Sequence, residues 1–449
     1  MKEKANRDYY PDNLAEVNES NTVVASENIY NESGALLVPA GAEISAETAK
    51  KIISHKLSKP IEESVALNRS VTSGVLVSHF SKMPEHPELL EIFANKTLLS
   101  QFEEECKGID NYPLINQKLT VMSEQFPDIY KKAVFGAFLS MLLCRELQLE
   151  EKQRHAVFIA ALARDIGLLH IDPEIVAKTG RVSAQEWRLL QGHVAISFHL
   201  LGLIPNIPQA TKIAVLEHHE RTDGFGYPRR KLEFELSQEG QIIAFSDMAI
   251  ALFNKYVISL GYSMQALEPI LQINASRHKY ENTRAAIRVF RNLIGPMKRK
   301  HSDRQIPELV ARLSRAHPLF NLLFLQMREF NDLLSKEKFD LDLNPSTHSL
   351  NALQSIMITS GISDESILRW IDSLKIETMK KQDVLEIEKY GLMISEGFWR
   401  FNELMKRFEV MLVSNGVSED KRDEFAGHFE QVKKTYRVLS STMSLEGQK

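Results

Sequence analysis

Apolar residues recur at helical spacing from about residue 128 to residue 295. Gly, Pro and Asn residues interrupt this pattern at intervals that suit the ends of helices. The interruptions predict helices at 128–147, 151–166, 183–201, 208–219, 238–255, 262–274 and 281–293. Residues 128–295 are therefore predicted to form one helical bundle domain.

A second helical region is predicted at residues 306–444, after a basic break at 296–304. Apolar side chains in this region recur every three or four residues, as in an amphipathic helix. The stripe comprises Ile387, Tyr390, Ile394, Phe398, Phe401, Met405, Phe408 and Leu412. It indicates the core of a C-terminal helical domain, and the seam of a homodimer is the alternative.

The N-terminal part carries the little β-structure that the sequence predicts. Residues 1–22 are polar and are expected to be flexible. The segments TVVA and ALLV flank the turn residues Asn31–Gly34 and predict a hairpin, and Ser45 is a suitable N-cap for a following helix. We expect a small α+β module at residues 23–60 and a connecting region at 61–127.

Composition agrees with a mainly α, soluble globular protein. The 449 residues exceed one ordinary core, and 43% of them are hydrophobic and 25% charged. The formal net charge of −4 argues against nucleic acid as a partner. The two cysteines, Cys106 and Cys144, are too few for a disulfide framework or a cysteine-based zinc site.

The sequence also predicts a cytoplasmic protein that does not span a membrane. The first residues, MKEKANRDYYPDN, lack the apolar segment of a signal peptide. The longest nearly uncharged apolar run, Ala133–Cys144, is too short to cross a bilayer.

The stretch EHHERTDGFGYP at residues 217–228 carries the strongest chemical signal. His218 and His219 point about 100° apart on a helix, which suits contacts to metals or phosphates from different sides. An isolated His pair would indicate only a surface helix end, but the loop after it argues against that interpretation. Its glycines and proline predict one specific loop conformation, with the motif residues Asp223, Gly224, Gly226, Tyr227 and Pro228.

Three further polar residues stand alone in apolar helices: Asp165, His193 and Asp247. Each taken singly is explained as a satisfied core residue or a cap. Together with the His pair they match the way in which a helical bundle builds a metal site from inward side chains. His and Asp are suitable ligands for Fe, Mn or Zn.

The stretch EHHERTDGFGYP resembles the signature of the HD-GYP family, a branch of the HD-domain metal phosphohydrolases. The segment NESGALLVPAGAEIS resembles a small module found ahead of such domains. The resemblance, which covers roughly residues 128–295, implies a bundle that hydrolyses cyclic di-GMP at two or three iron or manganese ions. It also implies that Asp165 bridges two metals and that the ligands are Asp165, His193, His218, His219 and Asp247.

Three positions depart from the family pattern. Arg164 stands where the family has the His of its HD pair, and Leu168 replaces a Lys three residues after Asp165. The family's first ligand His falls near Lys132, and residues 130–138 contain neither His nor Glu. A guanidinium has no lone pair for a metal, so we expect fewer divalent ions than in the family, or none.

The sequence leaves three interpretations of Arg164 open. In the first, its guanidinium pairs with Asp165, Asp247 or another acid and fills the vacated metal position. In the second, it holds a phosphate of a cyclic dinucleotide without cleavage. In the third, catalysis persists on an altered metal site.

These observations predict a degenerate HD-GYP protein that acts as a sensor or scaffold in cyclic di-GMP signalling. Its protein partners would bind the loop of residues 223–228 or the C-terminal helices. The alternative is a metal-dependent cyclic di-GMP phosphodiesterase on a reduced metal site, with Asp165 as a catalytic residue. The five retained ligands favour that alternative.

Overall fold

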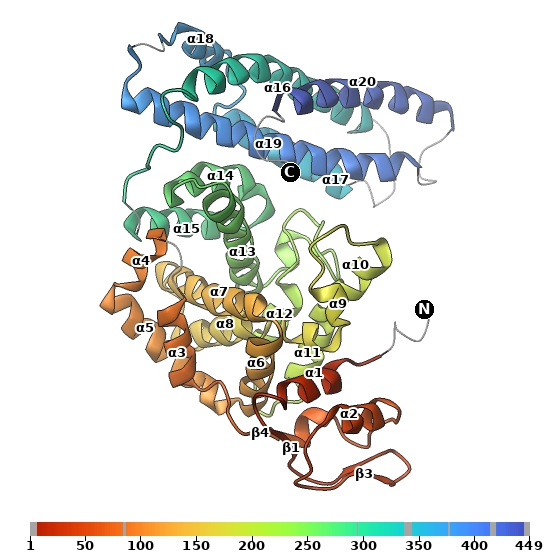
Figure 1. Ribbon diagram of the computed structural model, residues 1–449. Coiled ribbons are helices and arrows are strands. Elements are labelled where there is room, and N and C mark those ends of the chain that lie inside the picture. The colour runs from red at the N-terminus through yellow and green to blue at the C-terminus, as the bar shows by residue number, and fades with distance from the viewer. Residues whose placement is uncertain are drawn as a thin grey trace. The chain divides into compact units, whose positions relative to one another are not determined.

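The computed structural model describes residues 7–83, 87–293, 295–335, 344–375, 378–413 and 419–443 (Figure 1). Helices make up nearly all of its regular structure, which confirms the mainly α fold class. Contacts divide the chain into two compact units. The N-terminal unit holds residues 1–220, 227–230 and 236–250, and the C-terminal unit holds residues 221–226, 231–235 and 251–449.

The first helix, α1 (Tyr10–Val17), shows that the expectation of a flexible segment at 1–22 was wrong for these residues. Tyr10, Leu14 and Val17 are fully buried. The helix packs on α2 (Ala46–Ile53) and α6 (Pro113–Gln125). The helix was not predicted because its apolar stripe has only three residues and lies between polar neighbours.

Two small antiparallel pairs form the β-structure. Strand β2 (Ile29–Tyr30) pairs with β3 (Leu36–Val38) across the predicted turn. Strand β1 (Val23–Ala25) pairs instead with β4 (Val65–Leu67). The module therefore continues beyond residue 60, because its first strand finds its partner later in the chain.

The predicted connecting region at 61–127 contains helices α3 (Ser73–Lys82), α4 (Pro87–Phe93), α5 (Lys96–Cys106) and α6. The ring of Phe80 on α3 lies 4.1 Å from that of Phe102 on α5 and 4.8 Å from that of Phe138. These buried aromatic contacts make the region part of the core of the N-terminal unit rather than a connector.

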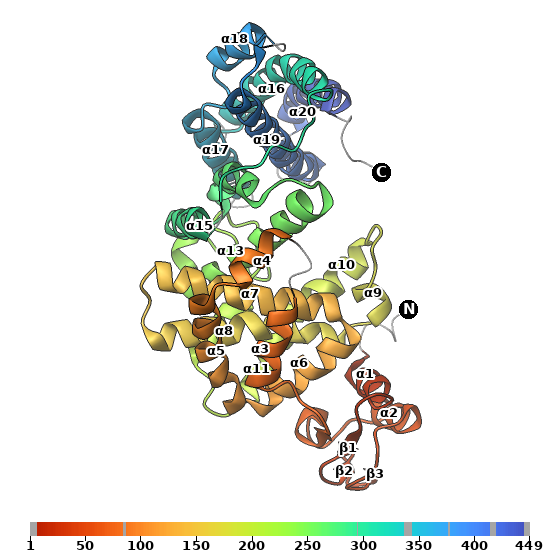
Figure 2. The ribbon, with the colours of Figure 1, turned by 60° about the vertical axis from the view of Figure 1, so that its left-hand side comes forward.

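Helices α7 (Pro127–Glu146) and α8 (Glu151–Ala163) form the centre of the N-terminal unit (Figure 2). Helix α8 packs on α7 and on α12 (Gln209–Glu217), which in turn packs on α11 (His193–Gly202). Every residue from Ala156 to Ala163 is buried, so α8 has no polar face along its second half. The C-terminal end of α8 therefore lies in the interior of the N-terminal unit.

One stretch of the described residues, Gln238–Ser259, is long and apolar enough to cross a membrane by length and composition. Its first 15 residues form α13 (Gln238–Leu252). Of the most apolar window, 61% is buried inside the structure, as in the core helix of a globular domain.

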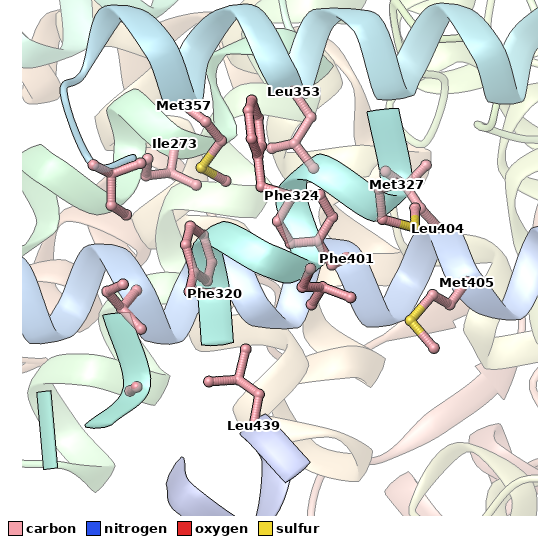
Figure 3. Packing of buried hydrophobic residues seen from close by; sticks show 14 of the residues in the cluster. Ile273, Phe320, Phe324, Met327, Leu353, Met357, Phe401, Leu404, Met405 and Leu439 are labelled. Carbon is pink, nitrogen blue, oxygen red and sulfur yellow. The ribbon is translucent and has the colours of Figure 1, made fainter. Parts of the chain in front are cut away.

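The C-terminal unit is built around α16 (Ile306–Ser335), α19 (Lys381–Val413) and α20 (Glu419–Met443). Helix α16 packs on both of the others, on α17 (Asn344–Thr359) and on α18 (Glu365–Ser373). Figure 3 shows Phe320, Phe324 and Phe401 packed together in this core. Most of the predicted α19 stripe lies in it, as the core interpretation expects: Ile387, Tyr390, Ile394, Phe401, Met405, Phe408 and Leu412.

The predicted break at 296–304 is not a loose linker. The carboxylate of Glu388 on α19 accepts hydrogen bonds from the backbone N–H groups of Lys300 and His301 and from Nδ1 of His301. The division between units falls instead at residue 250, so α14 (Leu267–Asn274) and α15 (Tyr280–Leu293) belong with the C-terminal helices.

Candidate metal centre

The pair Arg164–Asp165 lies where α8 ends. Arg164 is still helical, whereas Asp165 has φ −102° and ψ 4° and begins the 3₁₀ turn η4 (Ile166–His170). Because the chain leaves the α-helix between them, the two side chains can approach each other. Nε of Arg164 lies 3.1 Å from Oδ2 of Asp165 in an ion pair.

The side chain of Arg164 is only 1% exposed. Its buried guanidinium contacts hydrogen-bond acceptors on several sides. Nη1 donates to the carbonyl oxygen of Ala161 (2.9 Å), and Nη2 donates to that of Lys132 on α7 (3.4 Å). Nη2 also donates to Oδ1 of Asp247 on α13 (3.3 Å). The guanidinium thus lies against two carboxylates, which offset the cost of burying its charge.

Gly136 on α7 makes room for this guanidinium. A Cβ atom at position 136 would lie 2.5 Å from Nη1 of Arg164 and 3.3 Å from Cζ. Gly136 follows Lys132 by four residues and therefore shares its face of the helix. The sequence alone did not identify this glycine, because its role depends on an arginine from another helix.

We expect Gly136→Ala to destabilise the protein by about 1–3 kcal/mol, because the new methyl group must displace a buried guanidinium that several contacts hold. Urea unfolding measures the change. Gly202→Ala at the end of α11 is the control, since a Cβ atom there meets nothing within 4 Å. If Gly136→Ala were as stable as the wild type, Arg164 would not occupy this position in solution.

Four predicted ligands converge beside this ion pair. One ligand atom each from Asp165, His193, His218 and His219 lies within 4.8 Å of all the others. Nε2 of His193 is 3.3 Å from Nε2 of His218 and 3.5 Å from Oδ1 of Asp165. Three segments supply these residues: the end of α8, the start of α11 and the end of α12.

Backbone contacts determine which nitrogen of two of these rings carries the proton. Nδ1 of His193 lies 2.5 Å from the carbonyl oxygen of Leu190, and Nδ1 of His218 lies 2.6 Å from that of Val215. A carbonyl can only accept, so each Nδ1 donates and each neutral ring leaves a lone pair on Nε2.

When both rings are neutral, the two Nε2 lone pairs face each other and the Asp165 carboxylate. Such an arrangement is repulsive unless a cation lies among the three groups. Carbonyl-bound Nδ1–H groups are also the usual outer contacts of metal-ligating histidines. The donor set of three imidazoles and one carboxylate therefore fits one divalent metal ion.

Burial keeps two of the imidazoles in the form that binds metal. It lowers the pKa of His218 well below its ordinary value, and the neighbouring His219 and His193 lower it further. Burial also lowers the pKa of His219 to about 4, against the opposing effect of Asp247. Both rings are therefore neutral at physiological pH.

Asp247, the fifth predicted ligand, lies apart from this set. Its Oδ1 accepts the hydrogen bond from Arg164, and its Oδ2 lies 4.0 Å from Nδ1 of His219. Its side chain is 34% exposed, more than that of Asp165. The structure thus brings four predicted ligands together, whereas the fifth, Asp247, is hydrogen-bonded to the Arg164 guanidinium.

Three other histidines of the N-terminal unit, His155, His170 and His199, lie outside the ligand set. The ring of His155 stacks on that of Tyr112. His170 lies between Asp8 and the buried Lys118, whose Nζ also donates to Glu62. His199 is exposed on α11. None of these three belongs to the four-residue set.

The motif loop contacts the ligand set through Tyr227. Its backbone N–H donates to the carbonyl oxygen of His219 (3.1 Å), and its ring lies 4.7 Å from the His219 ring. Within the loop, Oδ1 of Asp223 accepts from the N–H of Phe225, and Gly224 has φ +74°. That conformation suits glycine and explains the residue type.

One group of residues that binds the start of this loop was not predicted from the sequence. Arg277, Arg400, Glu403 and Arg407 come from segments far apart in the chain, and all lie close to Arg221 and Asp223. No spacing pattern relates such positions, so only the folded structure could identify them.

Comparisons with known proteins find relatives of the part of the chain that carries this site. Residues 112–284 match the family model described as HD domain. The chain is 34% identical over 111 residues to 3'3'-cGAMP-specific phosphodiesterase 3 of Vibrio cholerae, covering 25% of this chain and 24% of that protein. It is 32% identical over 120 residues to a cyclic di-GMP phosphodiesterase of Thermotoga maritima, covering 26% and 32%.

The similarity to these relatives is partial. The matched segment spans about a quarter to a third of the length of each of the two. A solved structure, Bd1817, a HDG"Y"P protein from Bdellovibrio bacteriovorus, matches with a TM-score of 0.34 and 14% identity over 60% of this chain and 95% of that chain. That score is too low to support a conclusion about either protein.

Proposed function

Because the chain belongs to the HD-domain family through residues 112–284, we propose that it is a cytoplasmic signalling protein that binds a cyclic dinucleotide and holds one divalent metal. It acts as a sensor or scaffold rather than as a hydrolase. The relatives named above act on cyclic di-GMP or 3'3'-cGAMP, so these two molecules are the candidate ligands.

One observation carries this proposal: the Arg164 guanidinium lies between the carboxylates of Asp165 and Asp247. Two-metal hydrolysis uses one ion to generate hydroxide and both ions to clamp the attacking and leaving oxygens. A permanently positive, non-ligating group next to both carboxylates leaves them available for only one ion. The first interpretation of Arg164, a structural replacement, is therefore the one that we adopt.

Asp165, His193, His218 and His219 would hold the ion, for which iron or manganese is the expected identity. The bound ion would supply a Lewis acid for a phosphate oxygen. Arg164 offsets one of the two negative charges of Asp165 and Asp247, and a bound divalent ion would offset the rest, which favours an anionic ligand nearby. Asp247 and His219 are the partly exposed members of the site, and we propose that the dinucleotide approaches from their side.

A second candidate function is phosphodiester hydrolysis on this one-metal site. The complete set of four ligands, with the Nδ1 protons of His193 and His218 already committed to carbonyls, favours it. Asp165 would then be a catalytic residue. Metal content and turnover measured on the same sample distinguish the two functions.

We expect the purified full-length chain, loaded anaerobically with Fe(II) or Mn(II) and desalted, to retain about one ion per chain. It should bind cyclic di-GMP or 3'3'-cGAMP in calorimetry without hydrolysing either. His193→Ala should lose the ion, because three ligands remain, whereas His199→Ala on the same helix should keep it.

Three results would contradict the proposal in different ways. Two or more ions per chain with turnover would identify a phosphodiesterase of the family type. One ion with slow turnover would support the second candidate function. A chain that binds neither cyclic dinucleotide would have no role in detecting them.

A further inference from the structure

Six charged side chains of the C-terminal unit form a buried group, which we name the Glu403 cluster. Its members are Arg221, Asp223, Arg277, Arg400, Glu403 and Arg407. Arg221 lies just before the motif loop of residues 223–228 and Asp223 begins it, whereas Arg400, Glu403 and Arg407 lie on α19. Each of the six side chains is at most 24% exposed, so the group is largely removed from water.

Glu403 is the centre of this cluster. Its Oε1 accepts hydrogen bonds from Arg221 (3.0 Å), Arg277 (3.1 Å) and Arg407 (3.1 Å). Its Oε2 lies 3.8 Å from Nη1 of Arg400. One carboxylate thus serves four guanidiniums, and no neutral side chain could replace it in that role.

The first half of the motif loop is bound to this centre. Arg221 bridges Glu403 and Asp223, and Oδ2 of Asp223 also accepts from Oγ of Ser349 on α17 (3.0 Å). Cζ of Arg407 lies 3.6 Å from the centroid of the Phe225 ring. Arg221, Asp223 and Phe225 therefore each have a partner on the C-terminal helices.

The second half of the loop begins at Tyr227. Tyr227 lies against His219 through its ring and its backbone N–H. Five residues separate Arg221 from Tyr227, and Asp223 stiffens this segment through its bond to the N–H of Phe225. Because the connecting segment is this short, the chain itself limits how far Tyr227 can lie from the residues that α19 binds.

We infer that Glu403 is a positioning residue for the metal centre, which acts through the motif loop on His219. On this inference, the C-terminal helices of the same chain bind the loop. Asp223 and Phe225 are then unavailable to a separate protein. The inference rests on the proposed metal site.

Charge balance shows why Glu403 cannot be dispensed with. The cluster holds four arginines and two carboxylates, so positive charge is already in excess. Nε and Nη1 of Arg400 have no hydrogen-bond partner among the described residues. Burial would raise the pKa of Glu403, but Arg277, Arg221, Arg400 and Arg407 lower it to about 2. Loss of this carboxylate leaves guanidiniums buried without an acceptor, which is strongly destabilising for the local structure.

Glu403→Gln in the full-length chain tests the inference against a matched control. Glu396 lies two turns earlier on α19, is equally a carboxylate and is 1% exposed. Among the described residues, its hydrogen-bond donors are Lys255, Tyr256 and Asn274, none of which belongs to the loop. Glu396→Gln therefore reports the general cost of removing a buried charge from this helix. Arg407→Met is a second variant that removes a surplus cation together with the Phe225 contact, so that it should fold even if Glu403→Gln does not.

Two measurements are made on each variant: Mn(II) affinity by titration and hydrogen exchange of the amides at residues 222–227. We expect Glu403→Gln and Arg407→Met to raise the exchange of these amides and to weaken Mn(II) binding by about 10–100-fold, the usual range for outer contacts of a metal site. Glu396→Gln should change neither.

Folded Glu403→Gln and Arg407→Met proteins with wild-type exchange and wild-type Mn(II) affinity would overturn the inference. Faster exchange with unchanged affinity would also overturn it, because the loop would not position the centre. A wild-type chain that binds no Mn(II) would instead refute the proposed metal site, a result that the wild-type titration alone reveals.

Discussion

Replacing Arg164 and Lys132 together by His is expected to raise the metal content from about one to about two ions per chain. The double variant removes the guanidinium that now lies against Asp165 and Asp247 and adds an imidazole on α8 and another on α7. Asp247 then becomes free to ligate. We also expect the double variant to hydrolyse cyclic di-GMP on the order of 100-fold above the background rate measured with the inactive wild type, because a second ion can stabilise the leaving oxygen.

Arg164→Lys is the matched control for this experiment. It keeps a positive charge at the position but supplies neither the fork of the guanidinium nor a ligand, so the metal content should stay at one ion. Inductively coupled plasma mass spectrometry on folded, desalted samples measures the ratio. A double variant that folds cooperatively and still holds one ion would show that Arg164 is not what limits the site.

Asp165→Asn should have the largest effect on stability and should abolish metal binding. The change leaves the Arg164 guanidinium, 1% exposed, with Asp247 as its remaining charged partner. Removing one member of a buried ion pair costs about 3–5 kcal/mol, because the other charge stays buried without compensation. The same change removes the one carboxylate of the four-ligand set. Urea unfolding of metal-free protein measures the first effect, and metal analysis measures the second.

Asp247→Asn separates these two effects. Asp247 also pairs with Arg164, but its side chain is 34% exposed and it lies outside the four-ligand set. This variant should lose less stability than Asp165→Asn and should keep its ion. Loss of the ion in Asp247→Asn would mean that the metal centre extends to this carboxylate.

Much of the fold followed from periodicity. The predicted helix at 128–147 corresponds to α7 (Pro127–Glu146), and that at 281–293 to α15 (Tyr280–Leu293). Long apolar stripes make such helices visible because the period of 3.6 residues repeats several times. Helix α1 and the pairing of β1 with β4 were not predicted, because the helix is short and the pairing joins residues some forty positions apart.

The candidate site was partly visible in the same way. A signature of twelve contiguous residues identifies His218, His219 and the loop, and lone polar residues in apolar helices mark Asp165, His193 and Asp247. Sequence reasoning could not choose among the interpretations of Arg164, because adjacent positions on a helix do not face each other. The end of α8 at Ala163 removes that restriction and lets the ion pair form.

The sequence by itself determined the mainly α class, the helices of the bundle and which residue types are available for a metal. Local patterns suffice for these features, because they depend on neighbours within one or two turns. Only the tertiary structure decided that four ligands converge and a fifth pairs with Arg164, that Gly136 makes space for the guanidinium, and that Glu403 gathers four arginines around the loop. Each of these depends on distances between segments far apart in the chain, and side-chain packing sets those distances.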